Sequence, residues 1–442
     1  MRGTRRGRVF LLALVLFAGW ASAEAQLRSL SILHTNDLHA RLLPDAHGQG
    51  GFAQIAAILR RETAGCNSCL ILNAGDLVQG SPVSTIYRGL PVYELANLFR
   101  FDASVLGNHD FDYGWKRIQD FTKAARFPVI AANVRDPRGR LLADRANVIL
   151  TVNGIRLAII GALTADLPGL TTPDLQGPWQ VLPVAAAVRE QALALRQQAD
   201  LIVVLGHLNE KEEEELLREV PEVSAVISGH KHAGLEFPTV IDGRIMVRVK
   251  GFGVEVGRLD LEVDLAQKTV ASSSWKRFAV NAEEIAPAED MARQVRQWEA
   301  KVSRIVDIPI GTSRREFDRA ALQPLLERAM AEEMHTDLAF VNLEGIRDIL
   351  PAGAILARHV WNIMPFDNKV VIGKFRGSQL PSAISSRYPV EPDREYTLAT
   401  FDFVATNQRV ELGVTGLQFP NHTNRLARDV FIDWIKRQSV LE

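Results

Sequence analysis

The chain has 442 residues, of which 47% are hydrophobic and 23% are charged, and its formal net charge is −1. This composition is typical of a soluble globular protein, and the length favours two domains over one core. The near-neutral charge gives no sign of the basic surface that binding to a nucleic acid polymer requires.

The first 25 residues have the pattern of an export signal. Four arginines precede an apolar run over residues 9–20, and Ala21-Ser22-Ala23 offers a small-residue cleavage site. We expect a signal peptide over residues 1–23, with an alternative cut after Ala25. No cysteine follows closely and no later stretch is apolar for long enough to span a bilayer. We therefore expect a periplasmic or secreted protein without a membrane anchor.

The two cysteines, Cys66 and Cys69, follow a predicted helix over residues 51–63. A zinc site would need two more soft ligands nearby, and the adjacent sequence has none. In an exported protein this spacing favours a local disulfide. Two free thiols and a redox-active pair are the alternatives.

From Leu27 onward, short apolar runs alternate with amphipathic helical windows, which is the pattern of an α/β domain. Ligands bind to α/β folds at the edge of the sheet where such strands end. Five predicted strands are followed directly by Asp, His or Asn, and they cover residues 30–33, 70–72, 103–105, 201–205 and 225–227.

The polar residues after these strands are of the types that bind divalent cations. Together their nitrogen and oxygen atoms suffice for two ions of Zn, Mn, Fe or Co if one carboxylate bridges. The alternative is a separate turn residue at each strand end, but six of the ten histidines fall in these segments. We treat one of the six, His34, as structural because it points away from its neighbours along the strand. The candidate ligands are Asp37, His39, Asp76, Asn108, His207, His230 and His232.

The stretch from Leu106 to Gly114 adds groups that can handle protons. His109 can serve as a ligand or as a catalytic imidazole, and Asp112 lies within reach of an imidazole nitrogen. Taken alone, the stretch could also be a turn held by side-chain-to-backbone hydrogen bonds.

The rest of the chain completes the prediction. Asp242-Gly243 indicates a hairpin turn, and strands continue to about Val263, after which residues 266–274 lose their periodicity. The acidic run over residues 210–215 is predicted to be a solvated helix start. Further elements are a linker helix over 287–304, a helix over 320–334, a strand over 339–341, a β-rich section from 369 and a helix over 424–438.

Eight short motifs follow one another along the chain in a defined order. They are Asn36-Asp37-Leu38-His39, Gly75-Asp76, Gly107-Asn108-His109-Asp110, Phe111-Asp112-Tyr113-Gly114, Gly206-His207, Gly229-His230-Lys231-His232, Asn342 to Arg347, and Pro365-Phe366-Asp367-Asn368. The set resembles the calcineurin-like metallophosphoesterases, and within them the secreted bacterial 5′-nucleotidases, which include UDP-sugar hydrolases. The resemblance implies an α/β fold with a four-layer αββα domain over residues 26–284, a linker helix over 285–305 and a smaller α/β substrate-binding domain over 306–442.

The resemblance also implies a role for each candidate residue. One metal would be held by Asp37, His39, Asp76 and His232, and the other by Asp76, Asn108, His207 and His230, so that Asp76 bridges. His109 and Asp112 resemble the catalytic dyad. The implied substrate-binding residues are Asn342, Arg347, Phe366, Asn368 and Phe403.

One segment departs from the family pattern. After Phe403 the family usually has Gly-Gly-Asp-Gly, whereas this chain has Asn407-Gln408-Arg409-Val410. Arg409 cannot accept hydrogen bonds from ribose hydroxyls. Nucleoside preference could therefore be weakened, or shifted toward a more anionic substrate.

We therefore expect a monomeric metal-dependent phosphoric ester hydrolase that acts on a small molecule. It would convert 5′-nucleotides to nucleosides and phosphate, with a metal-bridging hydroxide as nucleophile and a His-Asp dyad. Other esters are alternatives, namely 2′,3′-cyclic nucleotides, nucleotide sugars and thiosulfate-type groups. The alternative of another class is a non-catalytic nucleotide-binding protein.

Overall fold

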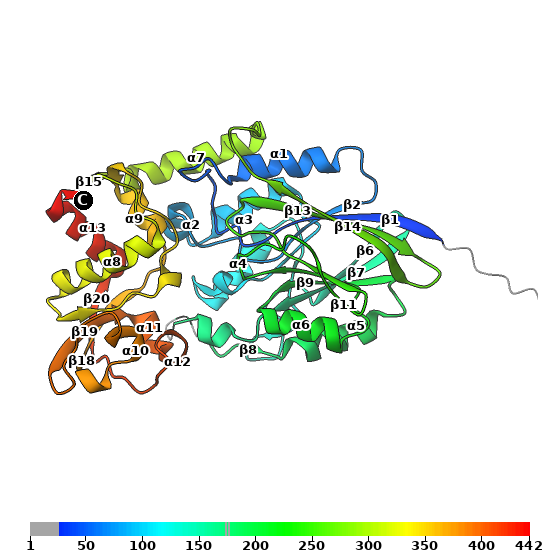
Figure 1. Ribbon diagram of the computed structural model, residues 1–442. Helices are drawn as coiled ribbons and strands as arrows, with labels where there is room; N and C mark the ends of the chain where they lie inside the picture. The colour runs from blue at the N-terminus through cyan, green and yellow to red at the C-terminus, as the bar shows by residue number, and fades with distance from the viewer. Residues whose placement is uncertain (1–25, 173–174, 176) are drawn as a thin grey trace, which may run out of the picture.

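The computed structural model describes residues 26–172, 175 and 177–442, and the expected signal peptide lies outside them (Figure 1). A first six-stranded sheet includes the predicted strands that precede Asp37, Asp76 and Asn108. Its strands β1 to β4 are parallel, and β13 and β14 extend it antiparallel beyond β1. The order is β14 (Thr269–Ala279), β13 (Glu255–Asp264), β1 (Leu27–Thr35), β2 (Cys69–Asn73), β3 (Ala103–Val105) and β4 (Val129–Ile130).

A second six-stranded sheet includes the other two predicted strands. Its four central strands are parallel, and its two outer strands, β11 and β6, are antiparallel to their neighbours. Asp242 and Gly243, both with positive φ, form the two-residue turn between β11 and β12, as predicted. The order is β11 (Thr239–Ile241), β12 (Arg244–Val247), β10 (Ala225–Gly229), β9 (Leu201–His207), β7 (Ile155–Leu163) and β6 (Asn147–Val152).

The two sheets pack face to face and helices cover their outer faces. Because side chains alternate along a strand, Ile32 of β1 points into the apolar layer between the sheets while Leu33 points outward. The outer face of the first sheet packs against α1 (Phe52–Thr63), α3 (Leu90–Ala96) and α7 (Glu289–Val306). The outer face of the second packs against α5 (Val184–Leu195) and α6 (Glu210–Glu219). This confirms the expected αββα layers.

The C-terminal elements build a smaller α/β unit with its own apolar core, which includes Phe401 and Trp434. Figure 1 shows it in yellow to red, at the end of the molecule opposite to the start of β1. Its helices include α8 (Arg319–Met334), α9 (Ala357–Ile363) and α13 (Ala427–Gln438). One sheet has the order β16 (Leu338–Ala339), β19 (Glu395–Phe401), β18 (Lys369–Arg376) and β20 (Asn421–Leu426), and the other β17 (Gly353–Leu356), β15 (Pro309–Ser313) and β21 (Val440–Leu441).

The prediction of irregular structure over residues 266–274 is wrong. Thr269–Ala279 forms β14, which pairs with β13 along its length. Because β14 is an edge strand, most of its side chains are exposed, including those of Ser272, Ser273 and Ser274. Such a strand lacks the apolar alternation by which a half-buried strand is recognised in a sequence.

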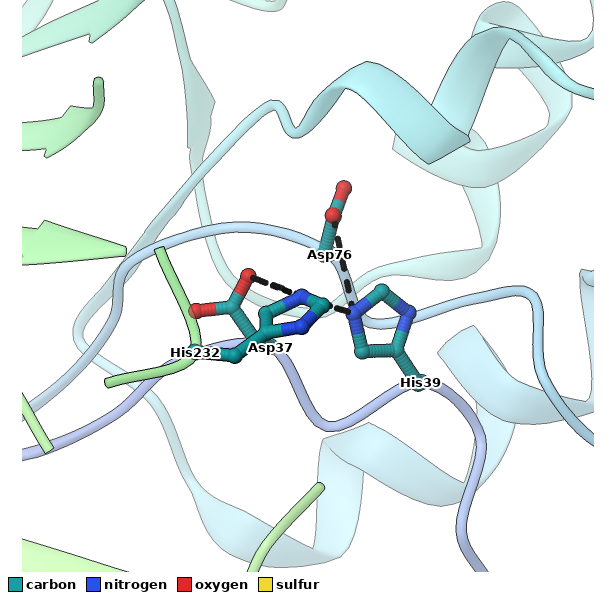
Figure 2. Close-up of side chains that lie close together, drawn as sticks. All are labelled: Asp37, His39, Asp76 and His232. Carbon is teal, nitrogen blue, oxygen red and sulfur yellow. Dashed lines mark hydrogen bonds and ion pairs between the residues drawn. The ribbon is translucent and has the colours of Figure 1, made fainter. Parts of the chain in front are cut away.

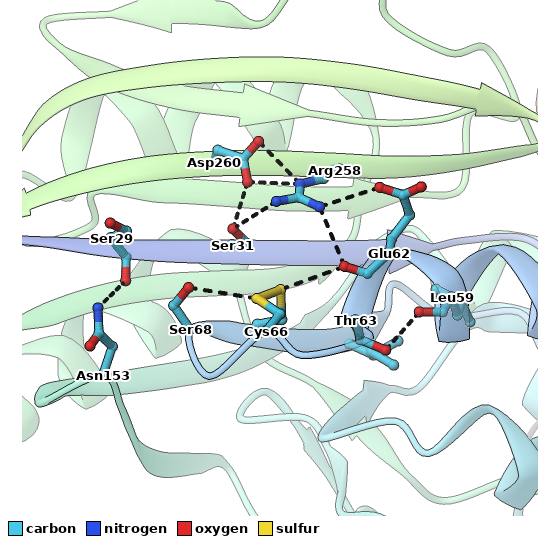
Figure 3. Close-up of a disulfide and its surroundings, with 12 residues drawn as sticks. Ser29, Ser31, Leu59, Glu62, Thr63, Cys66, Ser68, Asn153, Arg258 and Asp260 are labelled. Atoms are coloured by element: carbon cyan, nitrogen blue, oxygen red, sulfur yellow. Dashed lines mark hydrogen bonds and ion pairs between the residues drawn. A yellow bond between two sulfur atoms is a disulfide. The ribbon is translucent and has the colours of Figure 1, made fainter.

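A disulfide joins Cys66, in the loop after α1, to Cys69, the first residue of β2, as predicted (Figure 3). Close to it, the guanidinium of Arg258 contacts the carboxylates of Glu62 and Asp260. The disulfide and this ion-pair group lie together near the C-terminal end of α1. Across the residues that the structure describes, no helix combines the length and the apolar character needed to traverse a bilayer.

His34 of β1 is fully buried and its ring stacks on Trp275 at a centroid distance of 5.4 Å. Gly257 leaves space for the imidazole, because a Cβ there would lie 2.3 Å from His34 Nε2. Neither ring nitrogen has a hydrogen-bond partner within the described parts of the chain. Burial lowers the pKa of His34 from 6.5 to about 3, so the folded state favours the neutral imidazole.

We expect His34 to make the apoprotein less stable as the pH falls. The unfolded chain protonates this imidazole below pH 6.5, whereas the folded chain does so only near pH 3. The contribution of the neutral ring to the free energy of unfolding is therefore fully present above pH 6.5. Below that pH it decreases by about 1.4 kcal/mol per pH unit. Urea unfolding with a chelator, at about pH 7.5 and about pH 5, should show a smaller pH effect in His34→Leu than in the wild type. Equal pH effects would contradict the assignment.

Candidate metal centre

The candidate ligands follow parallel strands of both sheets and meet at one end of the sandwich. Asp37 and His39 follow β1, Asp76 follows β2 and Asn108 follows β3. His207 ends β9, and His230 and His232 follow β10. The loops after β1 and β2 are joined by backbone hydrogen bonds from Asp37 to Gly75 and from His39 to Asp76, each 3.0 Å long. All seven predicted ligands are thus brought together.

Four of these residues form a first cluster, shown in Figure 2: Asp37, His39, Asp76 and His232. One ligand atom of each lies within 4.8 Å of the others. The Nε2 atoms of His39 and His232 are 2.8 Å apart, and His232 Nε2 is 3.4 Å from Asp37 Oδ1. Two nitrogens and two carboxylates that converge in this way match the donors that first-row transition metals bind.

A second cluster adjoins the first through Asp76. His207 Nε2 lies 3.2 Å from Asp76 Oδ2 and 3.0 Å from Asn108 Oδ1, and His230 Nδ1 lies 3.0 Å from the same amide oxygen. Asp76 Oδ2 is buried and has no hydrogen-bond partner within the described residues. A buried anionic oxygen that lacks a hydrogen bond is costly unless a positive charge, from a proton on a neighbouring imidazole or from a metal ion, satisfies it. The residues present therefore fit a divalent ion at each cluster.

Five of the ligand residues have a backbone conformation that is rare outside glycine. Their φ angles lie between 47° and 83°. Each such residue costs on the order of 1–3 kcal/mol, and such residues concentrate at functional sites. This conformation lets consecutive loop residues turn their side chains toward one point. The five are Asp37, His39, Asp76, His230 and His232.

The electrostatics of the site favour ionised carboxylates, neutral imidazoles at His39 and His230, and a protonated imidazole at His207. Burial lowers the pKa of His39 well below its usual value and that of His230 to about 3. Burial alone would raise the pKa of Asp76, but His207 and His109 hold it well below the usual range. Burial would likewise lower the pKa of His207, but the Asp76 carboxylate raises it to about 9. Metal ligation requires deprotonated side chains, so an ion would replace the proton at His207.

His109 and Asp112 form a pair at the edge of the centre. His109 Nδ1 is 2.8 Å from Asp112 Oδ2, and the His109 backbone N–H donates to Asp76 Oδ1 at 3.0 Å. Burial would lower the pKa of His109, but the carboxylates of Asp112 and Asp76 raise it. The side chain is 13% exposed, so its Nε2 can reach a bound molecule as a proton donor.

Comparison of the chain with known proteins identifies its family. Residues 30–234 match the model of the calcineurin-like phosphoesterases, and residues 300–388 match the 5′-nucleotidase C-terminal domain. Protein UshA of Yersinia enterocolitica is 24% identical over 94% of this chain and 88% of its own length. The chain belongs to the 5′-nucleotidase family of calcineurin-like phosphoesterases.

Two further comparisons agree with this family. Protein 5NUC of Lutzomyia longipalpis is 32% identical to the chain, but the alignment spans only 54% of this chain and 45% of that protein. The crystal structure of the 5′-nucleotidase precursor from Thermus thermophilus has a TM-score of 0.83 at 24% identity. It covers 94% of this chain and 97% of the other. Its fold thus extends over both parts of this phosphoesterase.

Two of the expected substrate-binding residues of this phosphoesterase reach the metal centre from the C-terminal unit. Arg347 Nη2 lies 3.3 Å from His39 Nε2. The Phe366 ring is 5.6 Å from the His109 ring and 5.8 Å from the Arg347 guanidinium carbon. Burial lowers the pKa of Arg347 to about 10, so the guanidinium keeps its charge at neutral pH. An arginine and an aromatic ring therefore face the clusters.

The other three expected residues belong to the C-terminal unit. Asn342 is 6% exposed, and the Asn368 carbonyl accepts a hydrogen bond from Ala427 at the start of α13. Phe403 is half-buried and packs against the C-terminal core. No contact joins Phe403 to the metal clusters among the interactions of the described residues.

Arg409 lies on α12 (Gln408–Glu411), where its side chain is exposed. Glu411 at the end of the same helix is half-buried; burial raises its pKa, and the nearby Asn342 side chain counteracts this rise. An acidic side chain, that of Glu411, therefore lies near the predicted substrate-binding residue Asn342. It stands two positions after Arg409, which occupies the place of the family's acidic residue in the sequence. Residue spacing alone could not reveal this, because α12 turns the two side chains in different directions.

Several residues that support the candidate metal ligands were not predicted from the sequence. Asn36 Nδ2 donates to Asp37 Oδ2 at 2.6 Å. Asp110 Oδ2 accepts the Gly107 N–H at 2.8 Å, and burial raises the pKa of Asp110 to about 7. The Phe252 ring contacts the rings of His39 and His232 at 5.2 and 4.8 Å. Asn36 and Asp110 lie within two residues of candidate ligands, so their position in the sequence could have indicated them. Phe252 is far in the sequence from both His39 and His232, and no local pattern indicates it.

The acidic run also differs from expectation. Glu212 is 8% exposed and Glu213 only 1%, so part of the run is not solvated. Glu212 caps α6 together with Asn209 and accepts a hydrogen bond from the Ala165 backbone. Glu213 forms an ion pair with Arg248.

Proposed function

We propose that this phosphoesterase hydrolyses 5′-nucleotides to nucleosides and phosphate with the help of two divalent ions. The observation that carries the proposal is Asp76, whose carboxylate belongs to both ligand clusters while His109 stands beside them. Two such ions, when bound, would neutralise the charge that develops on the phosphoryl oxygens. Zn, Mn, Fe and Co all suit the donor set.

The protein's own residues would orient the ester and move one proton. Asp112 holds His109 through Nδ1, which leaves Nε2 to protonate the leaving oxygen as the P–O bond breaks. Arg347 would bind phosphate oxygens with its planar guanidinium. The alternative of a non-catalytic nucleotide-binding protein needs neither a shared carboxylate nor an imidazole held for proton donation.

The C-terminal unit would supply the recognition of the nucleoside. The match of residues 300–388 to the 5′-nucleotidase C-terminal domain supports this role. Phe366 and Phe403 would contact the base, and Asn342 and Asn368 its polar groups. In this proposal residues 26–284 form the catalytic domain, 285–305 the linker and 306–442 the substrate-binding domain.

We also propose that the protein acts as a monomer outside the cytoplasm, in the periplasm or secreted. The pattern of residues 1–23 supports export. Mass spectrometry of the mature N-terminus and size-exclusion chromatography would test the two statements. An intact Met1 in the natural host, or a stable dimer, would contradict the respective one.

A substrate panel tests the proposed reaction. AMP, ADP, UDP-glucose, 2′,3′-cyclic AMP and a generic aryl phosphate would be offered to protein reconstituted with each metal. We expect the highest kcat/KM with AMP. Turnover of the aryl compound alone would refute the nucleotidase proposal. Tight nucleotide binding without turnover under every metal would instead favour a binding protein.

Phe366→Ala is expected to raise the KM for AMP by about 5- to 150-fold, because stacking on an aromatic side chain is worth about 1–3 kcal/mol per base. The aryl phosphate offers no base, so its kcat/KM should change far less. Phe366→Tyr keeps a ring at the position and serves as the control. Steady-state kinetics on both substrates decides the matter, and an equal loss on both would show that Phe366 supports the metal centre instead.

A further inference from the structure

A buried ion pair lies outside the two clusters, between α6 and the end of β12. Arg248 is 3% exposed and Glu213 1%. The Arg248 Nη1 atom donates to both carboxylate oxygens of Glu213, at 2.7 and 2.8 Å. Nothing in the proposed reaction uses either side chain directly.

The same guanidinium also holds the segment that carries two ligand histidines. Arg248 Nε donates to the carbonyl of Ala233, the residue after His232, at 2.7 Å. The Arg248 carbonyl in turn accepts the Leu235 N–H at 2.9 Å. Arg248 thus holds the chain directly after His232 through both its side chain and its backbone carbonyl.

Glu213 also lies near the other end of this segment. Burial raises the pKa of the Glu213 carboxyl group, and Arg248 and the nearby Ser228 side chain, two residues before His230, counteract this rise. Arg248 therefore holds the end of the segment 228–233, and Glu213, beside the start of the segment, holds Arg248. Beyond Arg248, the Gly251 N–H donates to the His232 carbonyl at 3.0 Å.

The energetics favour a geometric role over a purely stabilising one. Desolvation of two charges costs several kcal/mol, so a buried ion pair is often no more stabilising than apolar side chains of similar volume. Apolar side chains could not hydrogen-bond the Ala233 carbonyl. His230 and His232 have φ angles of 83° and 54°, and such conformations persist only where the surroundings enforce them.

We propose that Glu213 and Arg248 are positioning residues that hold His230 and His232 in the geometry needed to bind metal. The inference rests on the proposed ligand set. Groups that orient metal ligands from outside typically change metal affinity 10- to 100-fold when they are replaced.

Glu213→Gln in the full chain provides the test, with Mn²⁺ and Co²⁺ affinities measured by competition with a chelator and the Co²⁺ absorption spectrum as a geometric readout. We expect an affinity lower by about 10- to 100-fold and an altered spectrum. Arg248→Lys keeps a positive charge but lacks the Nε–H that reaches Ala233, so we expect a loss in the same direction.

Two matched substitutions separate positioning from general stability. Glu210 lies on the same helix, 3.7 Å from the same guanidinium, but its side chain is 66% exposed. We expect Glu210→Gln to bind both metals like the wild type. Glu327 is buried and forms an ion pair with the partly exposed Arg387 in the C-terminal unit, so Glu327→Gln should lower the Tm and leave the metal affinity unchanged.

Each result bears on a distinct statement. Wild-type affinity and spectrum in Glu213→Gln, with a Tm lowered as in Glu327→Gln, would overturn the inference. If Glu213→Gln does not fold, Arg248→Lys gives the same comparison, and wild-type metal binding by that variant would overturn the inference equally. A wild type that binds metal but hydrolyses no nucleotide would refute the proposed reaction without affecting the inference.

Discussion

Asp76→Asn is expected to remove both divalent ions and to lower kcat/KM for AMP by about 10³-fold or more, which corresponds to several kcal/mol of lost charge stabilisation. Asp76 Oδ2 is 3.2 Å from His207 Nε2 in one cluster and 3.8 Å from His39 Nε2 in the other. An amide carries no negative charge and offers one oxygen, so it cannot bridge two cations. Metal content after dialysis, measured by mass spectrometry, is the direct readout.

Asp112→Asn is the matched control for this experiment. It makes the same carboxylate-to-amide change beside the same His109 but outside the ligand set, so both ions should remain. Loss of a single ion in Asp76→Asn would show that the carboxylate serves one cluster only, and the two-ion assignment would then be wrong.

His109→Ala is expected to lower kcat for AMP by about 10²- to 10⁴-fold, the usual range for a positioned proton donor, while both ions stay bound. Asp112 and Asp76 raise the pKa of His109, so the protonated form should be the active one. Activity of the wild type should therefore fall as the pH rises through this pKa, and that limb should vanish in His109→Ala.

The leaving group makes the test sharper. A nucleoside alkoxide needs a proton as it departs, whereas an acidic aryl oxide needs it less. The defect of His109→Ala should therefore be smaller on the aryl phosphate than on AMP. If metal content and kcat fell together, His109 would be a ligand and not a proton donor.

The sequence was informative about the metal centre for a local reason. Each parallel strand is a short apolar run, and the polar residues that follow within a few positions lie near the sheet edge, so Asp37, Asp76 and His207 could be placed without knowledge of the loops. The resemblance added the roles of His109 and Asp112. Their placement 2.8 Å apart agrees with a dyad, and the assigned roles remain predictions.

Features that depend on distant partners could not be predicted in this way. Glu213 and Arg248 are 35 residues apart in the sequence, and the acidic run around Glu213 resembles any exposed helix start. The β14 edge strand shows no apolar alternation because most of its side chains face solvent. At Arg409, alignment by position selected an exposed side chain, while the helix turns Glu411 toward Asn342.

Because the ligands come from both sheets, the metal centre also joins them mechanically. Asp37, Asp76 and Asn108 follow strands of the first sheet, while His207 and His230 belong to the second. Ions that bind only the native arrangement stabilise it by mass action, by about 2.7 kcal/mol at a free concentration 100 times the Kd. Chelation should therefore loosen one end of the sandwich before the rest, and amide hydrogen exchange and protease cleavage should accelerate first in the loops after β1, β2 and β10. In this protein, metal supply would then govern proteolytic lifetime as well as turnover.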